Sequence, residues 1–153
     1  MEGVIIKELQ AVNPLDERGM TYEIYRGLET KQITLCKRKR GTYSGNHYHK
    51  GEDPSKNLER FVIIDGTGRL LIYNGISLEE NIIKESEIII GPYILHAIIA
   101  DTDICFEEQR CTIFDREKTD TYSADSFLEY LDHCKMPINR SLFHKYLKTL
   151  KEI

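Results

Sequence analysis

Hydrophobic residues in the central part of the chain occur in short runs that polar turn-forming residues separate. From Ile33 to about Glu108 these runs are rich in isoleucine, valine, leucine, phenylalanine and tyrosine. This composition, with turn signals at close intervals, is typical of antiparallel strands in a sandwich or barrel. The pattern therefore predicts an all-β architecture over this region.

Two turn signals indicate where consecutive strands are joined. Asp65–Gly68 separates two apolar runs, and Asn74–Gly75 separates the second run from a third. An Asn-Gly pair tolerates the positive φ angles of a type I′ hairpin turn. We expect two consecutive hairpins here, followed by strands at Glu87–Ile90, Leu95–Ala100 and Ile104–Arg110.

The hydrophobic period changes from strand-like to helical after Thr112. A first helix is expected behind Ser123 or Asp125, either of which is a suitable N-cap. A second helix follows Pro137, and its apolar stripe contains Leu142, Phe143, Tyr146, Leu147, Leu150 and Ile153. We predict a β-barrel over residues 1–112 and a helical extension over 113–153 that packs on the barrel or on a dimer partner.

The amino-acid composition limits which kinds of binding partner and which cellular compartment are expected. The 153 residues suit one domain, and a formal charge of −4 gives no general attraction to nucleic acid. The four cysteines form no CxxC pair, which favours free thiols. The acidic start and the lack of a long apolar run predict neither a secretory signal nor a membrane partner, so we expect a cytoplasmic protein.

One strand carries two histidines that share a face. Side chains two apart point the same way in a strand, so His47 and His49 face one side and Tyr48 the other. Tyr43 has the same parity and is expected to share their pocket. Two neutral imidazoles suit a transition metal, although the pair alone is equally consistent with structurally bonded histidines.

The spacing of further residues resembles the signature of the cupin superfamily. The residues that carry the resemblance are Gly41, His47, His49, Glu59, Gly66, Pro92 and His96. The resemblance implies an antiparallel jelly-roll barrel in which His47, His49, Glu59 and His96 bind a divalent metal. Iron, manganese, nickel and zinc all suit three imidazoles and a carboxylate. Some cupins use the same histidines as acid or base without metal.

The chain departs from the cupin pattern between the histidine pair and the glutamate. Nine residues, Lys50 to Leu58, separate His49 from Glu59, more than in the family motif. Glu52 lies nearer the customary distance, but Glu59 keeps the family's gap to Gly66 and is the preferred ligand. His96 lies in an apolar run, where an unpaired histidine would be costly.

Two groups of cupins show more detailed similarity. The run Gly45–His49 with Glu59 and Phe61 resembles the cupin half of capsular-polysaccharide enzymes that act on nucleotide-activated keto-sugars. Asp16, Arg18 and Gly19, with the histidine pair and Lys50, are similar to dTDP-keto-sugar isomerases. Those isomerases place an arginine just before the pair, where this chain has Ser44.

These resemblances imply an isomerase or epimerase acting on a small nucleotide-sugar. His47 or His49 would be the base, and a metal or the Tyr43 hydroxyl would stabilise the enediolate, with Tyr93 a weaker candidate. The alternatives are an Fe(II)-dependent dioxygenase and a non-catalytic small-ligand-binding cupin. Cupins are commonly homodimers, and the segment 4–12 is a candidate for strand addition to a neighbouring subunit.

The remaining charged and titratable residues favour structural roles. The run Lys37–Arg40 fits either an edge strand protected by charge or, with at most two members, contact with a diphosphate. The edge strand is the preferred interpretation. His133 and His144 lie in the helical part and receive no role.

Overall fold

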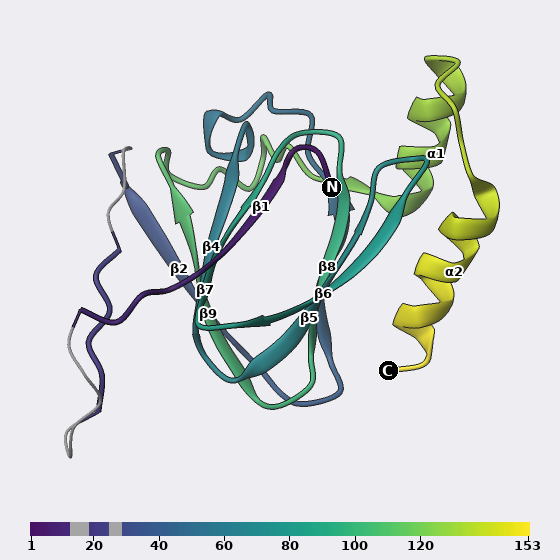
Figure 1. Ribbon diagram of the computed structural model, residues 1–153. Coiled ribbons are helices and arrows are strands. Elements are labelled where there is room, and N and C mark those ends of the chain that lie inside the picture. The colour runs from purple at the N-terminus through teal and green to yellow at the C-terminus, as the bar shows by residue number, and fades with distance from the viewer. Residues whose placement is uncertain (13–18, 25–28) are drawn as a thin grey trace.

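The chain forms two five-stranded antiparallel sheets that face each other, followed by two helices (Figure 1). This computed structural model describes residues 1–12, 19–24 and 29–153. The sheet orders are β1-β7-β4-β9-β2 and β10-β3-β8-β5-β6. The strands are β1 (Val4–Glu8), β2 (Gln32–Arg38), β3 (Tyr43–Tyr48), β4 (Glu59–Asp65), β5 (Thr67–Tyr73), β6 (Leu78–Lys84), β7 (Ser86–Ile90), β8 (Leu95–Ala100), β9 (Ile104–Arg110) and β10 (Tyr122–Ser123).

The interior between the sheets is packed by alternate residues of both. The buried apolar side chains of this interior are Phe61, Ile63, Leu70, Ile72, Ile83, Ile88, Ile90, Ile94, Ile98, Ala100, Ile104 and Phe106. Because strand side chains alternate, the neighbours of these residues point outward. The β-strand pattern predicted from the sequence is confirmed.

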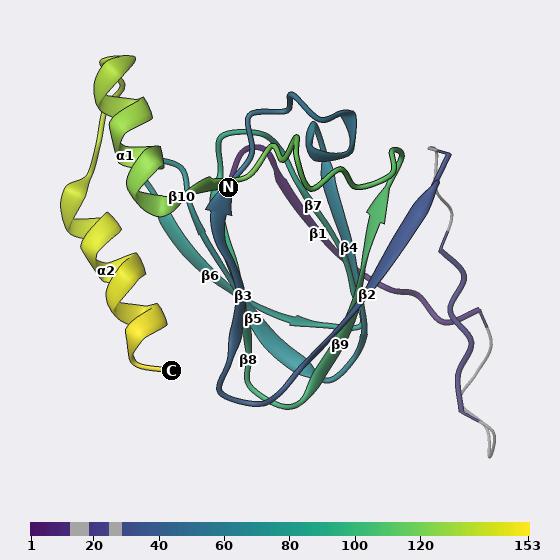
Figure 2. The ribbon, with the colours of Figure 1, turned by 180° about the vertical axis from the view of Figure 1, so that it is seen from behind.

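The helices cover the outer face of the sheet that contains β3 and β8 (Figure 2). Helix α1 (Ala124–His133) and helix α2 (Arg140–Lys151) bury Phe127, Phe143 and Tyr146 against that face. The Ser123 side chain accepts a hydrogen bond from the backbone N–H of Ser126, so Ser123 rather than Asp125 is the N-cap. A short 3-10 helix, η1 (Pro54–Lys56), lies in the loop before β4.

The first of the two predicted hairpins is wrong. β4 pairs with β7 and β9, whereas β5 pairs with β6 and β8, so the chain crosses from one sheet to the other at Gly66. Gly66 has φ +85°, and a Cβ there would collide with the backbone of Asp103. Gly66, which suggested a hairpin, is instead needed where the chain passes from one sheet to the other.

The second predicted hairpin is confirmed, but with a longer loop. β5 and β6 pair antiparallel from Tyr73↔Leu78, which leaves residues 74–77 in the connection. Asn74 Oδ1 accepts hydrogen bonds from the backbone N–H groups of Ile76 and Ser77. A side-chain-capped loop therefore replaces the tight Asn-Gly turn.

Several smaller expectations can be compared with the structure. β2 is an edge strand, which agrees with the edge interpretation of the run Lys37–Arg40. All four cysteines are free, as predicted. The segment Val4–Glu8 pairs with β7 of its own chain. Neither helix in the described part of the chain is long and apolar enough to cross a membrane.

Candidate metal-binding site inside the barrel

A β-bulge in β3 determines which of its side chains enter the barrel. Gly45 pairs with Ala97 and His47 with His96, so Asn46 is an extra residue between the two pairs. Gly45 has φ +96°, and a Cβ at this position would lie 2.8 Å from the carbonyl oxygen of His96. The bulge therefore requires glycine at Gly45 and places His47 directly opposite His96.

The same bulge makes the parity argument for Tyr43 wrong. Ser44 pairs with Ile98, an interior residue, whereas Tyr43 pairs with Ile99, which packs beneath the helices. The inserted residue shifts the alternation by one, which counting along the sequence did not include. Tyr43 nevertheless lines the same cavity as the histidines, and it is 42% exposed. Ser44 instead accepts a hydrogen bond from Arg38 Nε.

The structure brings together His47, His49, Glu59 and His96. Ligand atoms of these four residues all lie within 4.8 Å of one another. Oε2 of Glu59 is 3.0 Å from Nε2 of both His49 and His96. The ring centre of His47 lies 4.8 Å from that of each other histidine. His47 is partly exposed, whereas the other three residues are buried.

The hydrogen bonds of the two buried histidines fix which nitrogen carries the proton. Nδ1 of His49 contacts the backbone oxygen of Asp120, and Nδ1 of His96 lies 3.0 Å from the backbone oxygen of Ile94. A carbonyl oxygen only accepts, so each Nδ1 is the donor, and in the neutral form of either ring the lone pair lies on Nε2.

Three electron-rich atoms consequently face one another in a buried space. With neutral rings, Nε2 of His49, Nε2 of His96 and Oε2 of Glu59 have no hydrogen-bond partner. The two 3.0 Å separations from Oε2 are ion pairs only when a ring is protonated. A cation among them would satisfy all three, and backbone-bonded Nδ1 atoms are typical of histidines that ligate metals. The donor set therefore fits a divalent transition metal, with His47 in reach as a further donor.

The electrostatic setting keeps the carboxylate ionised. Burial alone would raise the pKa of Glu59, but the charge of His96 in its protonated form, hydrogen bonds from the rings of His49 and His96, and the Lys56 ammonium outweigh burial and lower that pKa. Burial, followed by the neighbouring His96, lowers the pKa of His47 to about 3. At neutral pH the site therefore holds an anionic glutamate and a neutral His47.

The site lies in a cavity of about 390 Å³ that is lined by both polar and apolar residues. Beyond the four residues, polar groups come from Arg38, Tyr43, Ser44, Lys56, Glu108 and Thr121. Apolar surface comes from Cys36, Phe61, Ile98, Phe106 and Phe114. Such a mixed lining suits a small molecule with both charged and apolar parts.

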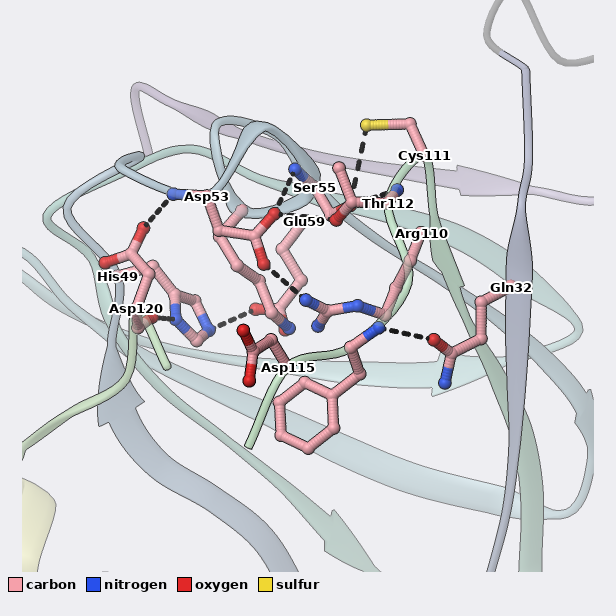
Figure 3. Close-up of polar contacts among 12 residues, drawn as sticks. Gln32, His49, Asp53, Ser55, Glu59, Arg110, Cys111, Thr112, Asp115 and Asp120 are labelled. Carbon is pink, nitrogen blue, oxygen red and sulfur yellow. Dashed lines mark hydrogen bonds and ion pairs between the residues drawn. The ribbon is translucent and has the colours of Figure 1, made fainter. Parts of the chain in front are cut away.

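Asp120 is a site residue that the sequence did not reveal. Its backbone oxygen orients His49, and its carboxylate accepts a hydrogen bond from the backbone N–H of Asp53 at 3.1 Å (Figure 3). The same carboxylate accepts the backbone N–H of Lys50 at 2.8 Å. No local pattern links Asp120 to His49, because the contact depends on how the chain returns after β9. Lys56 was missed for the same reason, since an exposed-looking lysine carries no positional signal. Arg38 belongs to the run considered for diphosphate contact, and it lines the cavity.

Other predicted residues lie elsewhere. Glu52 accepts a hydrogen bond from the Tyr122 hydroxyl, so it is Glu59 that joins the imidazoles. Tyr93 stacks on Tyr130 of α1, with ring centres 4.8 Å apart. His133 and His144 are on the helices. Asp16 and Arg18 of the second resemblance lie outside the described residues.

Solved structures with the same fold come from several bacteria. A sugar 3,4-ketoisomerase from Thermoanaerobacterium thermosaccharolyticum in complex with TDP has a TM-score of 0.69 at 12% identity, covering 87% of this chain and 97% of its own. A TDP-quinovose 3,4-ketoisomerase from Campylobacter jejuni has a TM-score of 0.66 at 17% identity, covering 84% and 99%. A double variant of a 3'-monoepimerase from Streptomyces bikiniensis in complex with dTDP has a TM-score of 0.68 at 14% identity, covering 99% and 97%.

These similarities confirm the predicted cupin barrel with its pair of C-terminal helices. No curated protein sequence matches the chain. The sequence pattern of the polysaccharide biosynthesis C-terminal domain matches residues 14–122, from before β2 to the start of β10, and the two helices lie outside this match. The chain therefore belongs to the polysaccharide biosynthesis C-terminal domain family.

Proposed function

We propose that this protein is a metal-dependent isomerase or epimerase that acts on a nucleotide-activated keto-sugar. The observation that carries the proposal is the buried convergence of His49, Glu59 and His96 without hydrogen-bond partners, inside a cavity of small-molecule size. Structures of the same fold supply the substrate class, because one holds TDP and another, a variant of a ketoisomerase, holds TDP-4-keto-6-deoxyglucose.

His49, Glu59 and His96 would hold the metal, and His47 would transfer the proton. A bound divalent ion supplies Lewis-acid polarisation of the sugar carbonyl. His47 lines the cavity and is the least buried of the four, so it is the imidazole that a substrate can reach. In its neutral form it takes the proton from the carbon beside the carbonyl and returns a proton to the former carbonyl carbon. The hydroxyl proton of the first carbon passes to the former carbonyl oxygen, so the isomerisation balances without a co-reactant.

Arg38 is the side chain best placed to contact an anionic substrate. Its guanidinium lies 5.9 Å from the Phe106 ring centre and lines the same cavity as the histidines. Arginine suits a diphosphate because it offers several donors in one plane. Lys37 and Lys39 border a second hollow, which Arg38 also lines, but they do not line the cavity of the histidines.

Proton exchange tests this function directly. The purified protein, reconstituted separately with each candidate metal, is incubated in deuterated water with TDP-4-keto-6-deoxyglucose and related keto-sugar nucleotides. We expect deuterium at the carbon beside the carbonyl, detected by mass spectrometry and NMR. Absence of exchange across the substrates with every metal would contradict the proposal.

An Fe(II) dioxygenase is the second candidate, because three imidazoles and one carboxylate with open positions also suit oxygen chemistry. Oxygen uptake that depends on added Fe(II), without proton exchange, would favour it. Nucleotide-sugar binding that persists after removal of all four donor side chains would instead indicate a non-catalytic binding protein.

We further propose that the protein is a homodimer. The sheet that the helices leave uncovered exposes Ile5, Ile33, Leu35 and Ile64 on its outer face. Apolar surface of this kind is typical of subunit interfaces. Light scattering should give twice the chain mass for the natural protein and a lower mass for Leu35→Glu. A monomer at every concentration would contradict the proposal.

A further inference from the structure

The loop from Lys50 to Leu58, which is longer than in the cupin motif, places the side chain of Lys56 in the site. Lys56 belongs to η1, between His49 and Glu59, and is only 6% exposed. Its ammonium contacts Oε1 of Glu59 and lies 2.5 Å from Oε1 of Glu108. A buried lysine needs such partners, because an unpaired charge in the interior is costly.

The loop is fixed in place from several directions. Asp53 caps η1 by accepting the backbone N–H of Ser55 at 2.8 Å, and it also accepts the Thr112 hydroxyl at 3.0 Å. Arg110 pairs with the same carboxylate, and Asp120 holds the backbone N–H of Asp53 (Figure 3). Lys56 therefore approaches Glu59 in an orientation set by groups outside the metal site.

This arrangement gives the two oxygens of Glu59 different surroundings. Oε1 is occupied by the Lys56 ammonium, whereas Oε2 faces the two imidazole nitrogens and has no hydrogen-bond partner. We propose that Lys56 is a positioning residue that reserves Oε1, so that Glu59 binds the metal through Oε2 alone. The inference rests on the metal site of the proposed function.

Binding through one oxygen affects both the coordination and the affinity of the metal. A carboxylate with both oxygens free can take two positions on an ion, whereas the one held by Lys56 takes one and leaves a position for a substrate oxygen. The Lys56 ammonium also offsets part of the negative charge of Glu59, which weakens the attraction between this carboxylate and the metal ion. Removing Lys56 should therefore strengthen metal binding while lowering substrate turnover.

Cobalt(II) binding tests the inference without requiring the sugar reaction. In Lys56→Met we expect weaker visible absorption, the signature of a higher coordination number, and a cobalt dissociation constant at least about ten-fold lower. Lys56→Arg, which keeps the charge, should resemble the natural chain. Lys50→Met is the matched control, because the Lys50 ammonium lies over the Tyr122 ring at 4.0 Å and does not line the cavity.

Each outcome separates this inference from the metal site itself. If Lys56→Met has the spectrum and the cobalt affinity of the natural chain, the positioning role of Lys56 is overturned but the metal site is not. Weaker cobalt binding in Lys56→Met would also overturn the positioning role alone. Failure of the natural chain to bind cobalt would overturn the metal site and the inference with it. If circular dichroism shows that Lys56→Met is unfolded, Glu108→Gln, which removes the second anchor of Lys56, must produce the same changes to a smaller extent.

Discussion

The interior of the barrel has two halves that differ in how their side chains are satisfied. In the apolar half, Ile63, Leu70 and Ile72 are completely buried among other hydrocarbon groups. In the polar half, His49, Glu59 and His96 are almost as buried, yet each retains an atom without a hydrogen bond. Burial of the apolar side chains stabilises the fold, whereas each buried polar atom without a hydrogen bond lowers the free energy of unfolding.

Residues of the apolar half and residues of the polar half are direct neighbours on paired strands. Ile72 lies opposite His96, and His96 shares the inward face of β8 with Ile98. The polar half is therefore not a region of loose packing. It is a part of the same interior where stability is given up for a binding site, and the mutations below should separate the two contributions.

The largest effect is expected at the proton-transfer residue. His47→Asn should lower the deuterium-exchange rate by at least about 100-fold, because general base catalysis is removed. The metal content and the free energy of unfolding should stay near those of the natural protein. Loss of the metal in this variant would instead assign His47 to the ligands, as the four-residue prediction from the sequence has it.

In the apolar half, truncation should reduce stability without affecting the site. Ile72→Ala should lower the free energy of unfolding by about 2–5 kcal/mol, since it removes buried methylene groups and leaves a cavity. Urea titration measures the change, and elemental analysis should find unaltered metal content. Metal loss in the folded variant would show that the two halves are not separable.

The corresponding change in the polar half should have a smaller effect. In metal-free protein, His96→Leu should lower the free energy of unfolding by less than Ile72→Ala does, because removal of the unsatisfied Nε2 offsets loss of the hydrogen bond to Ile94 and of support for the Glu59 carboxylate. The same titration with a chelator present tests this. A marked loss of stability would mean that His96 supports the fold rather than the site.

The smallest effect is expected at the outer support of the polar half. Burial alone would raise the pKa of Asp53, but hydrogen bonds from Ser55 and Thr112 and the charge of Arg110 lower it below 3.8. Asp53→Asn should therefore cost about 1 kcal/mol at pH 7. That difference should fall as the pH drops below about 4 and the natural carboxyl takes up its proton. A pH-independent difference would contradict this account.

The sequence predicted those parts of the fold that depend on local pattern. Strand alternation put His47 and His49 on one face, the cupin resemblance added His96, and helical spacing placed Phe143 and Tyr146 on a packed face. It failed where an inserted residue or a sheet crossing broke the alternation, at Asn46 and Gly66. A bulge leaves no period in the sequence, so Tyr43 was placed on the wrong face.

The candidate site was predictable only as far as the cupin spacing reaches. That spacing identified Glu59 despite the long loop, and the structure places Glu59 at the imidazoles. Lys56 and Asp120 reach the site through contacts distant in sequence or inside an irregular loop, for which no residue pattern exists.

Metal content is the measurement that tests the central claim most directly. The natural protein, purified without added metal and then equilibrated with a mixture of divalent ions, should retain about one ion per chain after dialysis. His49→Ala with His96→Ala should retain none, whereas His133→Ala with His144→Ala, which removes two helical histidines, should match the natural protein. Equal metal content in all three proteins would contradict the site.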